Sequence, residues 1–464
     1  MEALLPPASP DFAAFGATLR GHVILPGDAA YDEARKLHDP SVDRRPAAIV
    51  RVADAQDVSR TIRFARASGL ELAIRSGGHS IPGHSMVDDG VVIDTTELKS
   101  LHIDPAAKVA WAGAGLTAGE YTKAAAEFGL ATPFGDSPSV GIAGLTLGGG
   151  IGYLVRKFGL AIDSLLAVEL VTADGRIVTA SADDNQDLFW AVRGGGGNFG
   201  VVTRFRYRLH EVGLVYGGAL LLPLTKETVR GLVDLGAEAP DELSIIAFAM
   251  PIPPLPVVPP EAVGTPSLML TLVYAGDPEA GARALAPFRA LAEPIADLVG
   301  PMPYPAIYQL TEGGEGEMPP LAGQSTFVSD FDDAAIDELL ARHADPSIPF
   351  VFTQIRPLGG AMARVPADAT AFAHRDAKLM IMVLAAHDGN PMPVIGWVAD
   401  YLAKAFGDKR TGVYSNFLHD EGEARIRQAY PGSTYERLAA IKRRWDPTNV
   451  FHRNQNIRPL ATAG

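Results

Sequence analysis

The sequence contains no cysteine. Disulfides, thiolate zinc sites, iron–sulfur clusters and cysteine nucleophiles all need a cysteine side chain, so this one absence excludes all four. We predict no metal site. The redox compartment stays open, because a chain without cysteine suits either side of a membrane.

The sequence also lacks the segments that direct a chain to or across a membrane. The N-terminal stretch MEALLPPASPDFAAFGATLRG has no basic start followed by an unbroken apolar run. A run of about 18 apolar residues, the minimum for a membrane-spanning helix, occurs nowhere. We therefore expect no membrane association and a cytoplasmic location.

Basic residues are outnumbered and scattered. There are 40 Lys and Arg against 54 Asp and Glu, a net charge of −14, and no basic run that could follow a phosphate backbone. Nucleic acid is therefore not an expected partner.

The composition is that of a folded globular protein, with 47% hydrophobic and 20% charged residues. A chain of 464 residues is too long for one ordinary core, so we expect two domains or one domain with a large insert. No repeat with a period of 20 to 50 residues is present. Short strands alternate with helices up to about residue 205, whereas residues 206 to about 410 carry longer strands and Ala-rich helices. This change predicts an antiparallel sheet backed by helices in the second region.

Several local elements can be placed from pattern alone. The strand AAIVRV precedes a helix that Asp54 can cap and Gly69 can end. In the second region the segment 281–299 is typical of a helix, and the proline-rich segment 251–260 is typical of a surface loop. Five strands are expected there: GGALLLPL, LSIIAFAMP, SLMLTLVYAG, FVFTQIRPLGG and AKLMIMVLAAH.

Three glycine clusters distinguish the first region: Gly77 with Gly78, then Gly141 to Gly152, then Gly194 to Gly200. Glycine lets successive backbone amides turn toward a phosphate without a side chain in the way. Each cluster alone is more typical of tight turns than of a ligand site. Together they favour a bound dinucleotide.

A second interpretation competes for the dinucleotide. Gly113, Gly115 and Ala118 match the G-x-G-x-x-A spacing of a Rossmann turn between a strand and a helix. The acidic residue that should follow could only be Asp136, in a Pro- and Gly-rich loop. This interpretation predicts an NAD-dependent dehydrogenase and leaves the other glycine clusters without a role.

A resemblance weighs against that alternative. Four segments, in order and spacing, resemble the berberine-bridge-enzyme-like FAD-linked oxidases of the vanillyl-alcohol-oxidase superfamily: RSGGHS, GIAGLTLGGGIGYLVRKFGLAIDSLLAVELVTADG, DLFWAVRGGGGNFGVVT and YERLAAIKRRWDPTNVFHRNQNIRP. The resemblance implies an α+β fold with a two-subdomain, PCMH-type FAD-binding domain and an inserted substrate domain. It also implies a discontinuous order: residues 1–205, then the insert 206–411, then residues 412–464 completing the FAD-binding domain.

The resemblance also implies which residues hold FAD. His79 occupies the position that bonds to the flavin 8α-methyl in this family. Ser137 stands where the family has a cysteine bonded to flavin C6, so only the histidyl bond is chemically possible here. Gly135, two residues earlier, would leave dioxygen room beside the flavin. The other implied contacts are Arg75, Ser76, Gly77, Gly78 and Ser80 around the diphosphate; Gly141, Gly144, Gly149 and Gly152 beside the isoalloxazine and ribityl groups; Gly200, Val201 and Val202 near the adenine; and Tyr414, Asn454 and Asn456 at the ring.

For catalysis the resemblance implies hydride transfer from an alcohol or amine C–H of a small molecule to FAD and then to dioxygen, giving hydrogen peroxide. Tyr414 is the expected proton acceptor, with Arg356 as the cation that would stabilise its phenolate. Gln354, two residues from Arg356 on the same strand, should share its face. A relative carries a carboxylate at the Gln354 position, so a substrate held by an amide hydrogen bond is expected. An FAD-dependent dehydrogenase with another acceptor and a non-catalytic flavin-binding protein remain alternatives.

Overall fold

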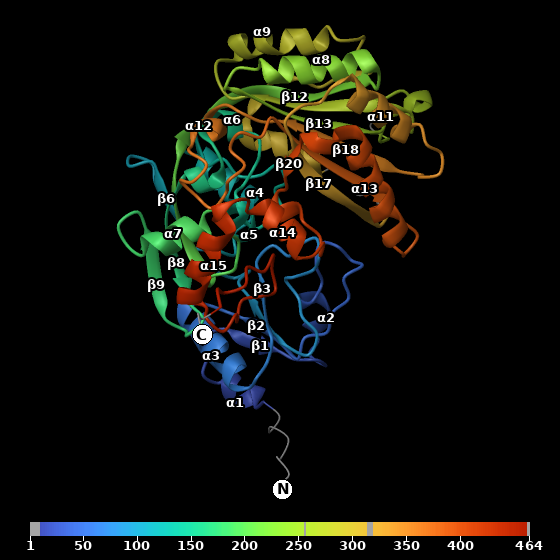
Figure 1. Cartoon of the computed structure of the whole chain (residues 1–464). Helices are drawn as coiled ribbons and strands as arrows, with labels where there is room; N and C mark the ends of the chain where they lie inside the picture. The colour runs from blue at the N-terminus through green and yellow to red at the C-terminus, as the bar shows by residue number, and fades with distance from the viewer. Residues whose placement is uncertain (1–9, 255–256, 313–318, 462–464) are drawn as a thin grey trace.

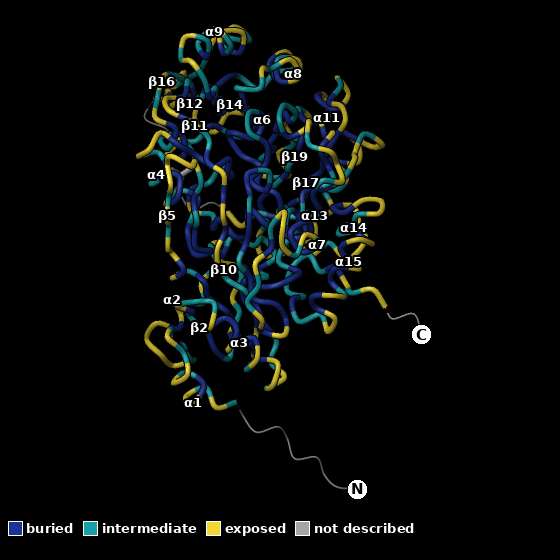
Figure 2. Tube along the Cα trace, turned by 90° about the vertical axis from the view of Figure 1, so that its left-hand side faces the viewer, coloured by how far each residue is buried: buried dark blue, intermediate teal, exposed yellow. Residues whose placement is uncertain are grey.

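The computed structural model describes residues 10–254, 257–312 and 319–461. The chain forms an elongated molecule with the N-terminal sheet at one end and a large sheet at the other (Figure 1). Helices α14 (Glu423–Ala429) and α15 (Ser433–Trp445), from the last part of the chain, lie between these two ends (Figure 1). Buried backbone runs through the interior along the whole length, and exposed residues lie on the outside (Figure 2).

The first sheet has four strands, of which β2 and β3 both run parallel to β4. Helix α3 (Ala55–Ala67) joins β2 to β3, and the Asp54 side chain accepts from two backbone amides at its start. Gly69 follows the helix with a φ of 68°, so the predicted cap and end are both confirmed. In spatial order the strands are β1 (His22–Ile24), β2 (Ala48–Arg51), β4 (Val91–Asp94) and β3 (Leu72–Arg75).

The second sheet has five strands, and every pairing in it is antiparallel. In spatial order they are β5 (Leu101–Asp104), β6 (Val109–Gly113), β10 (Val201–Arg208), β8 (Leu165–Val171) and β9 (Ile177–Ser181). The short strands β7 (Leu130–Ala131) and β11 (His210–Glu211) pair separately.

The Rossmann interpretation is wrong. A strand does precede helix α4 (Ala118–Ala126), but this strand, β6, is antiparallel to both its neighbours, whereas a Rossmann unit needs parallel strands. A Cβ on Gly113 would lie 2.0 Å from the Leu98 carbonyl oxygen, and one on Gly115 would lie 2.2 Å from that of Thr95. These glycines therefore allow close contact between backbones and do not face a ligand.

The third sheet is nine-stranded and antiparallel throughout, which confirms the α+β class. Along its path lie β15 (Ala296–Asp297), β12 (Leu214–Pro223), β14 (Pro266–Tyr274), β13 (Leu243–Pro251), β18 (Val351–Pro357), β19 (Leu379–Ala386), β17 (Leu321–Val328) and β20 (Arg410–Gly412), with β16 (Gly300–Pro303) paired to β12. The five strands expected from the sequence are among them.

Four helices back this sheet and share one apolar core with it: α8 (Lys226–Ala237), α9 (Pro278–Arg289), α11 (Asp333–His343) and α13 (Met392–Phe406). Figure 1 shows α8 and α9 over the outer side of β12. The remaining helices are α1 (Phe12–Gly16), α2 (Tyr31–Ala34), α5 (Ile142–Gly148), α6 (Val155–Phe158), α7 (Gln186–Val192), α10 (Gln309–Glu312), α12 (Ala361–Arg364), α14 (Glu423–Ala429) and α15 (Ser433–Trp445), with 3₁₀ turns η1 (Ala161–Asp163), η2 (Pro260–Ala262), η3 (Tyr304–Tyr308), η4 (Gly407–Lys409) and η5 (Ser415–Phe417).

In this region the expected helix over 281–299 is shorter than predicted, and the proline-rich segment 251–260 forms a loop between two regular elements. The helix expected over 281–299 ends at Arg289; the ring of Pro294 would clash with a helical carbonyl four residues earlier, at the observed end, and strand β15 follows it. In the segment 251–260, Pro251 closes strand β13 and Pro260 begins η2, while residues 255 and 256 lie outside the described residues. The described remainder between these two prolines is irregular, as expected for a loop.

The end of the chain returns to the first two sheets. Lys442 of α15 is fully buried and donates to the carbonyl oxygens of Asn198 and Phe451, both at 2.7 Å, and to Asp446 at 2.8 Å. Ile457 donates from its backbone to Asn198 Oδ1 at 2.9 Å. These bonds fix residues 433–457 against the glycine cluster that precedes β10.

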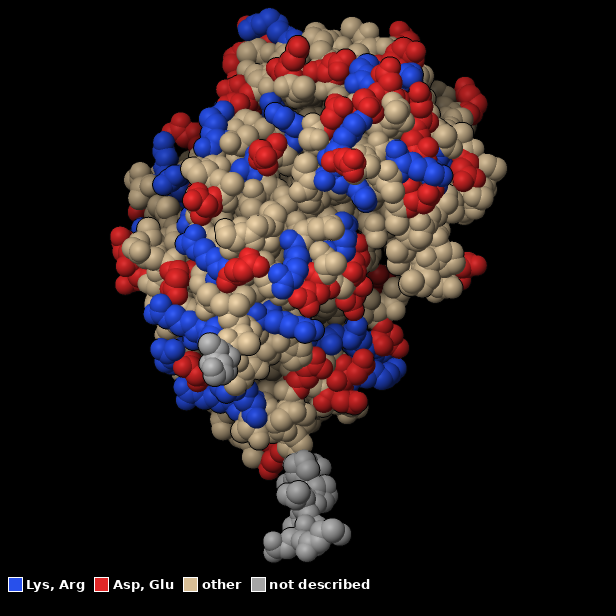
Figure 3. All heavy atoms as spheres, in the orientation of Figure 1, with Lys and Arg blue, Asp and Glu red and all other residues tan. Residues whose placement is uncertain are grey.

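Basic and acidic side chains are interspersed on the face shown in Figure 3. Among the described residues, no helix is both long and apolar enough to cross a membrane, and no group of three or more metal-ligating side chains gathers.

Candidate functional site

A cavity of about 650 Å³ brings the separate parts of the chain together. Its walls come from the turn after β3, the segment 135–147, the glycine cluster before β10, strands β18 and β19, and the tail. Of the residues expected from the sequence, it is lined by Ser76, Gly77, Gly78, His79, Ser80, Gly135, Ser137, Gly141, Gly144, Gly200, Val201, Val202, Gln354, Arg356, Tyr414 and Asn454.

The turn after β3 offers backbone amides to this cavity. The N–H groups of residues 77–80 donate to no acceptor among the described residues. A Cβ on Gly77 would lie 2.3 Å from the Gly141 nitrogen, so the first two glycine clusters are in backbone contact. Unpaired amides on a glycine turn are the arrangement that binds phosphate oxygens.

His79 presents a neutral imidazole at this turn. Burial, helped by the nearby His38 and opposed by the backbone of Ser139, lowers the pKa of His79 to about 4. The His38 ring is stacked on His79, with the ring centroids 4.0 Å apart. Because the unprotonated ring keeps a lone pair, His79 can act as a nucleophile at neutral pH.

The segment that begins at Gly135 runs along the cavity wall toward strand β18. Ser137 Oγ lies 3.3 Å from Ser139 Oγ, and Ser137 lines the cavity where a cysteine would have stood. Asp136 accepts a hydrogen bond from Arg356 Nη2 at 2.5 Å. The sequence analysis named Asp136 only as the acidic residue of the Rossmann alternative. In the structure Asp136 forms an ion pair with Arg356 of β18.

Tyr414 is buried in the wall of the cavity, with 3% of its surface exposed. Its phenol oxygen accepts hydrogen bonds from the Gly150 backbone and from Asn416 Nδ2, both at 3.0 Å. Burial raises the pKa of Tyr414, while these two donors and the charge of Arg356 lower it, and burial prevails. The resting side chain is therefore a phenol, whereas the sequence-based expectation required a net stabilisation of the phenolate.

Gln354 and Arg356 share one face of β18, as expected, and both are buried. Arg356 Nε donates to Gln354 Oε1 at 2.6 Å, and the guanidinium lies over the Phe417 ring. Since its oxygen is engaged by Arg356, Gln354 keeps its amide N–H groups for a ligand in the cavity.

Four residues expected at the cofactor do not line the cavity. The Arg75 side chain turns to the carbonyl oxygen of Ala34. Gly149 packs against Phe372 and Tyr414, and a Cβ on Gly152 would lie 1.9 Å from a carbonyl oxygen, so both are needed for packing. Asn456, the fourth, lies in a neighbouring cavity.

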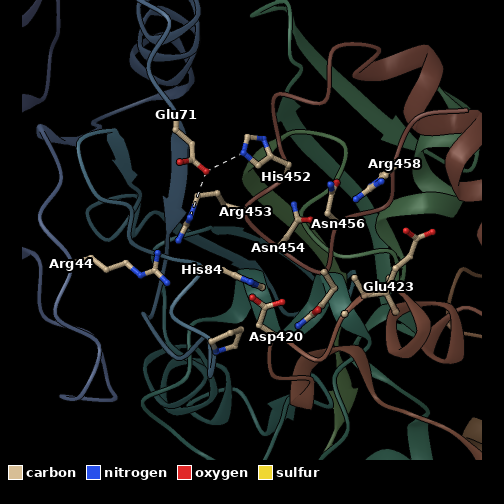
Figure 4. A pocket seen from close by; sticks show the side chains of 14 residues that line it. Arg44, Glu71, His84, Asp420, Glu423, His452, Arg453, Asn454, Asn456 and Arg458 are labelled. Carbon is tan, nitrogen blue, oxygen red and sulfur yellow. Dashed lines mark hydrogen bonds and ion pairs between the residues drawn. The ribbon is translucent and has the colours of Figure 1, made fainter. Parts of the chain in front are cut away.

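That neighbouring cavity measures about 350 Å³ and carries side chains of both charge signs (Figure 4). Glu71 pairs there with His452 and Arg453 (Figure 4). The smaller cavity shares five lining residues with the larger one: Pro82, His84, Arg453, Asn454 and Gln455. The side-chain oxygens of Asn454 and Asn456 are buried without a hydrogen-bond partner in the described structure.

Comparison with known proteins decides the family. The FAD binding domain family matches residues 46–181, and the berberine and berberine-like family matches residues 413–458. The (R)-6-hydroxynicotine oxidase of Paenarthrobacter nicotinovorans is 32% identical over 95% of this chain and 97% of its own length. The chain belongs to the berberine-bridge-like FAD-linked oxidoreductases.

Solved structures of this family superpose over nearly the whole chain. The 6-hydroxy-D-nicotine oxidase of Arthrobacter nicotinovorans has a TM-score of 0.83 at 29% identity, covering 95% of this chain and 98% of that one. The berberine-bridge-like protein 1 of Physcomitrella patens also has a TM-score of 0.83, at 26% identity, covering 97% and 99%. The expected α+β, PCMH-type flavoprotein fold is thereby confirmed.

The cavity of this FAD-linked oxidoreductase fits its cofactor. The free amides of residues 77–80 suit a diphosphate, the unpartnered Asn454 oxygen can accept from a flavin N–H, and His79 lies on the same wall as the amides. Sequence reasoning missed His38, Asp136, Asn198 and Asn416, because each is defined by contacts with residues distant in the chain.

Proposed function

We propose that this protein is an FAD-linked oxidase with singly attached FAD. On this proposal it takes a hydride from an alcohol or amine C–H of a small molecule and passes the electrons to dioxygen, giving hydrogen peroxide. The observation that carries the proposal is that His79 and Tyr414 line one cavity. When bound, the flavin supplies the two-electron acceptor for the hydride.

Attachment through His79 is supported by its neutral imidazole and its place on the phosphate-binding turn. The serine at position 137 cannot form the second, cysteinyl bond. Flavin should therefore stay with acid-precipitated protein, and His79→Ala should release it. Yellow colour that washes out of the denatured parent protein would contradict the attachment.

The substrate side is supported as a site for an uncharged molecule. Phe352, Met382 and Phe417 give it apolar walls. Arg356 and Asp136 balance each other's charge. The Asp136 carboxylate is therefore already engaged and does not serve to bind an ammonium group. Gln354 offers N–H donors to an oxygen of the substrate, and Tyr414, in its minor phenolate form, receives the hydroxyl proton as the hydride leaves.

This preference can be tested with two molecules of one skeleton, benzyl alcohol and benzylamine. Each is added to the holoenzyme, and shifts in the flavin absorbance report binding. The alcohol should bind more tightly than the protonated amine, and Gln354→Glu should reverse the order because it adds a negative charge. Tighter binding of the amine by the parent enzyme would contradict the proposal.

Dioxygen as acceptor is supported by the resemblance, which implies a small residue at Gly135 beside the flavin, and by the position of Gly135 in the cavity wall, where Leu145 packs against it. The test is to reduce the bound flavin photochemically without air, then admit air and measure reoxidation and peroxide. An oxidase should reoxidise faster than free reduced flavin, with one peroxide per flavin. Slow reoxidation in air combined with rapid recovery by a quinone would identify a dehydrogenase instead.

A further inference from the structure

His38 is fixed against the histidine proposed to carry the flavin. It lies after α2, and its backbone N–H donates to the Gly78 carbonyl oxygen at 3.2 Å. The neighbouring Leu37 approaches Gly78 so closely that a Cβ there would lie 3.4 Å from its side chain. The segment therefore holds the phosphate-binding turn through its backbone, and its imidazole reaches His79.

The two imidazole rings meet face to face. Their centroids are 4.0 Å apart and their planes are inclined by 23°. Ring N–H groups and lone pairs lie in the plane of each ring, so stacked rings cannot exchange a hydrogen bond. His38 thus acts on His79 through the face of its ring and not by moving a proton.

Stacking restricts how the His79 ring can turn. His79 lines the cavity, and the ring of His38 covers one face of its imidazole. The ring of His38 blocks rotation out of this plane. Holding a reacting atom in position lowers the entropic part of a barrier, so orientation should affect the rate of bond formation.

We propose that His38 is a positioning residue for flavin attachment, holding the ring of His79 so that its free nitrogen meets the 8α-methyl carbon of FAD. This inference rests on the proposed covalent link. In that reaction a C–N bond forms while one methyl C–H and the imidazole N–H are lost. The two protons and two electrons leave together with dioxygen, the oxidant, as hydrogen peroxide.

The test measures attachment separately from binding. The parent and the variants His38→Ala and His38→Phe are collected at intervals after synthesis is stopped. Total flavin is read from absorbance, and attached flavin from the fluorescence of acid-precipitated protein. His102→Ala, on β5, controls for the loss of a histidine remote from the cavity. Because His38 is exposed, these changes should leave the fold intact.

We expect the bound flavin of His38→Ala to become acid-stable more slowly than that of the parent by on the order of tenfold or more, since orientation contributes heavily to such steps. His38→Phe should restore a rate within about threefold of the parent, because phenyl keeps the stacking face. Equal rates for His38→Ala and the parent would overturn the inference, as would a Phe variant as slow as the Ala variant. A parent protein without acid-stable flavin would instead overturn the covalent attachment itself.

Discussion

Replacing Tyr414 with Phe removes one oxygen atom from the middle of the cavity and tests the proposed chemistry directly. If the phenolate accepts the substrate proton, its loss should slow flavin reduction by on the order of 10² or more, the usual size of a general-base contribution. Flavin attachment should not change, because His79 is untouched. The measurement is stopped-flow reduction under anaerobic conditions.

The raised pKa adds a pH signature. Because burial raises the pKa of Tyr414 above its ordinary value of 10.0, the phenolate is a minor species at neutral pH. The rate of flavin reduction should therefore rise by about tenfold per pH unit up to at least pH 10, and this slope should vanish in the Phe variant. A profile that is flat from pH 7 to pH 10 in the parent would refute the phenolate as proton acceptor.

The same substitution should have a stability cost. The buried Gly150 N–H donates to Tyr414 alone, whereas Asn416 Nδ2 also donates to the Leu145 carbonyl oxygen. An unpaired buried amide costs about 1–3 kcal/mol, which should appear as a lower midpoint of urea unfolding. Tyr430→Phe is the matched control, since Tyr430 lines the same cavity and donates to the Gly194 carbonyl oxygen. Reduction within about threefold of the parent in Tyr414→Phe, or an equal loss in Tyr430→Phe, would remove Tyr414 from the mechanism.

Three further outcomes are expected. Gly135→Val should slow reoxidation of the reduced flavin by air by on the order of tenfold or more, about 1.4 kcal/mol in barrier, because even its Cβ would lie 2.7 Å from Leu145; an unchanged rate in oxygen-jump experiments would contradict this. Lys442→Met should destabilise the fold by about 3–5 kcal/mol in urea unfolding, because it leaves Asp446 as an unpaired buried charge, and a loss below about 1 kcal/mol would show that this ion pair does not hold the tail. Burial lowers the pKa of His343 from 6.5 to about 4, so the folded protein should lose stability as the pH falls from 6.5 toward 4. His343→Gln should reduce the loss of stability between pH 7.5 and pH 5 by about 1–2 kcal/mol, and an unchanged pH dependence of stability in this variant would contradict the prediction.

Local chemistry made much of the fold predictable from the sequence. Asp54 caps its helix and Gly69 ends it because these effects involve neighbours within a few residues. The strands β13 and β19 were predictable because a strand buried on both faces gives a nearly continuous apolar run. The turn at Gly77 and Gly78 lines the cavity, as expected. Glycine is needed wherever another group approaches the backbone closely, so the residue type alone indicated such a contact.

Contacts between residues far apart in the chain could not be predicted from the sequence. The ion pair of Asp136 with Arg356 joins residues 220 positions apart, and nothing local in either segment indicates it. The stacking of His38 on His79 depends on how α2 is placed against β3. Arg75 was expected at the diphosphate because it adjoins the turn, but at the end of its strand the side chain points to Ala34. Such directions are decided by tertiary packing.

The late return of the chain to the cavity has a consequence for biosynthesis. Tyr414, Asn416 and Asn454 belong to the tail, which completes walls that otherwise come from His38, from residues 74–202 and from the nine-stranded sheet. During translation, the phosphate-binding turn and the whole large sheet leave the ribosome before these three residues do. Stable capture of FAD must therefore wait until the segment fixed by Lys442 has emerged and folded back, so cofactor loading follows elongation and cannot guide the folding of the nascent N-terminal half.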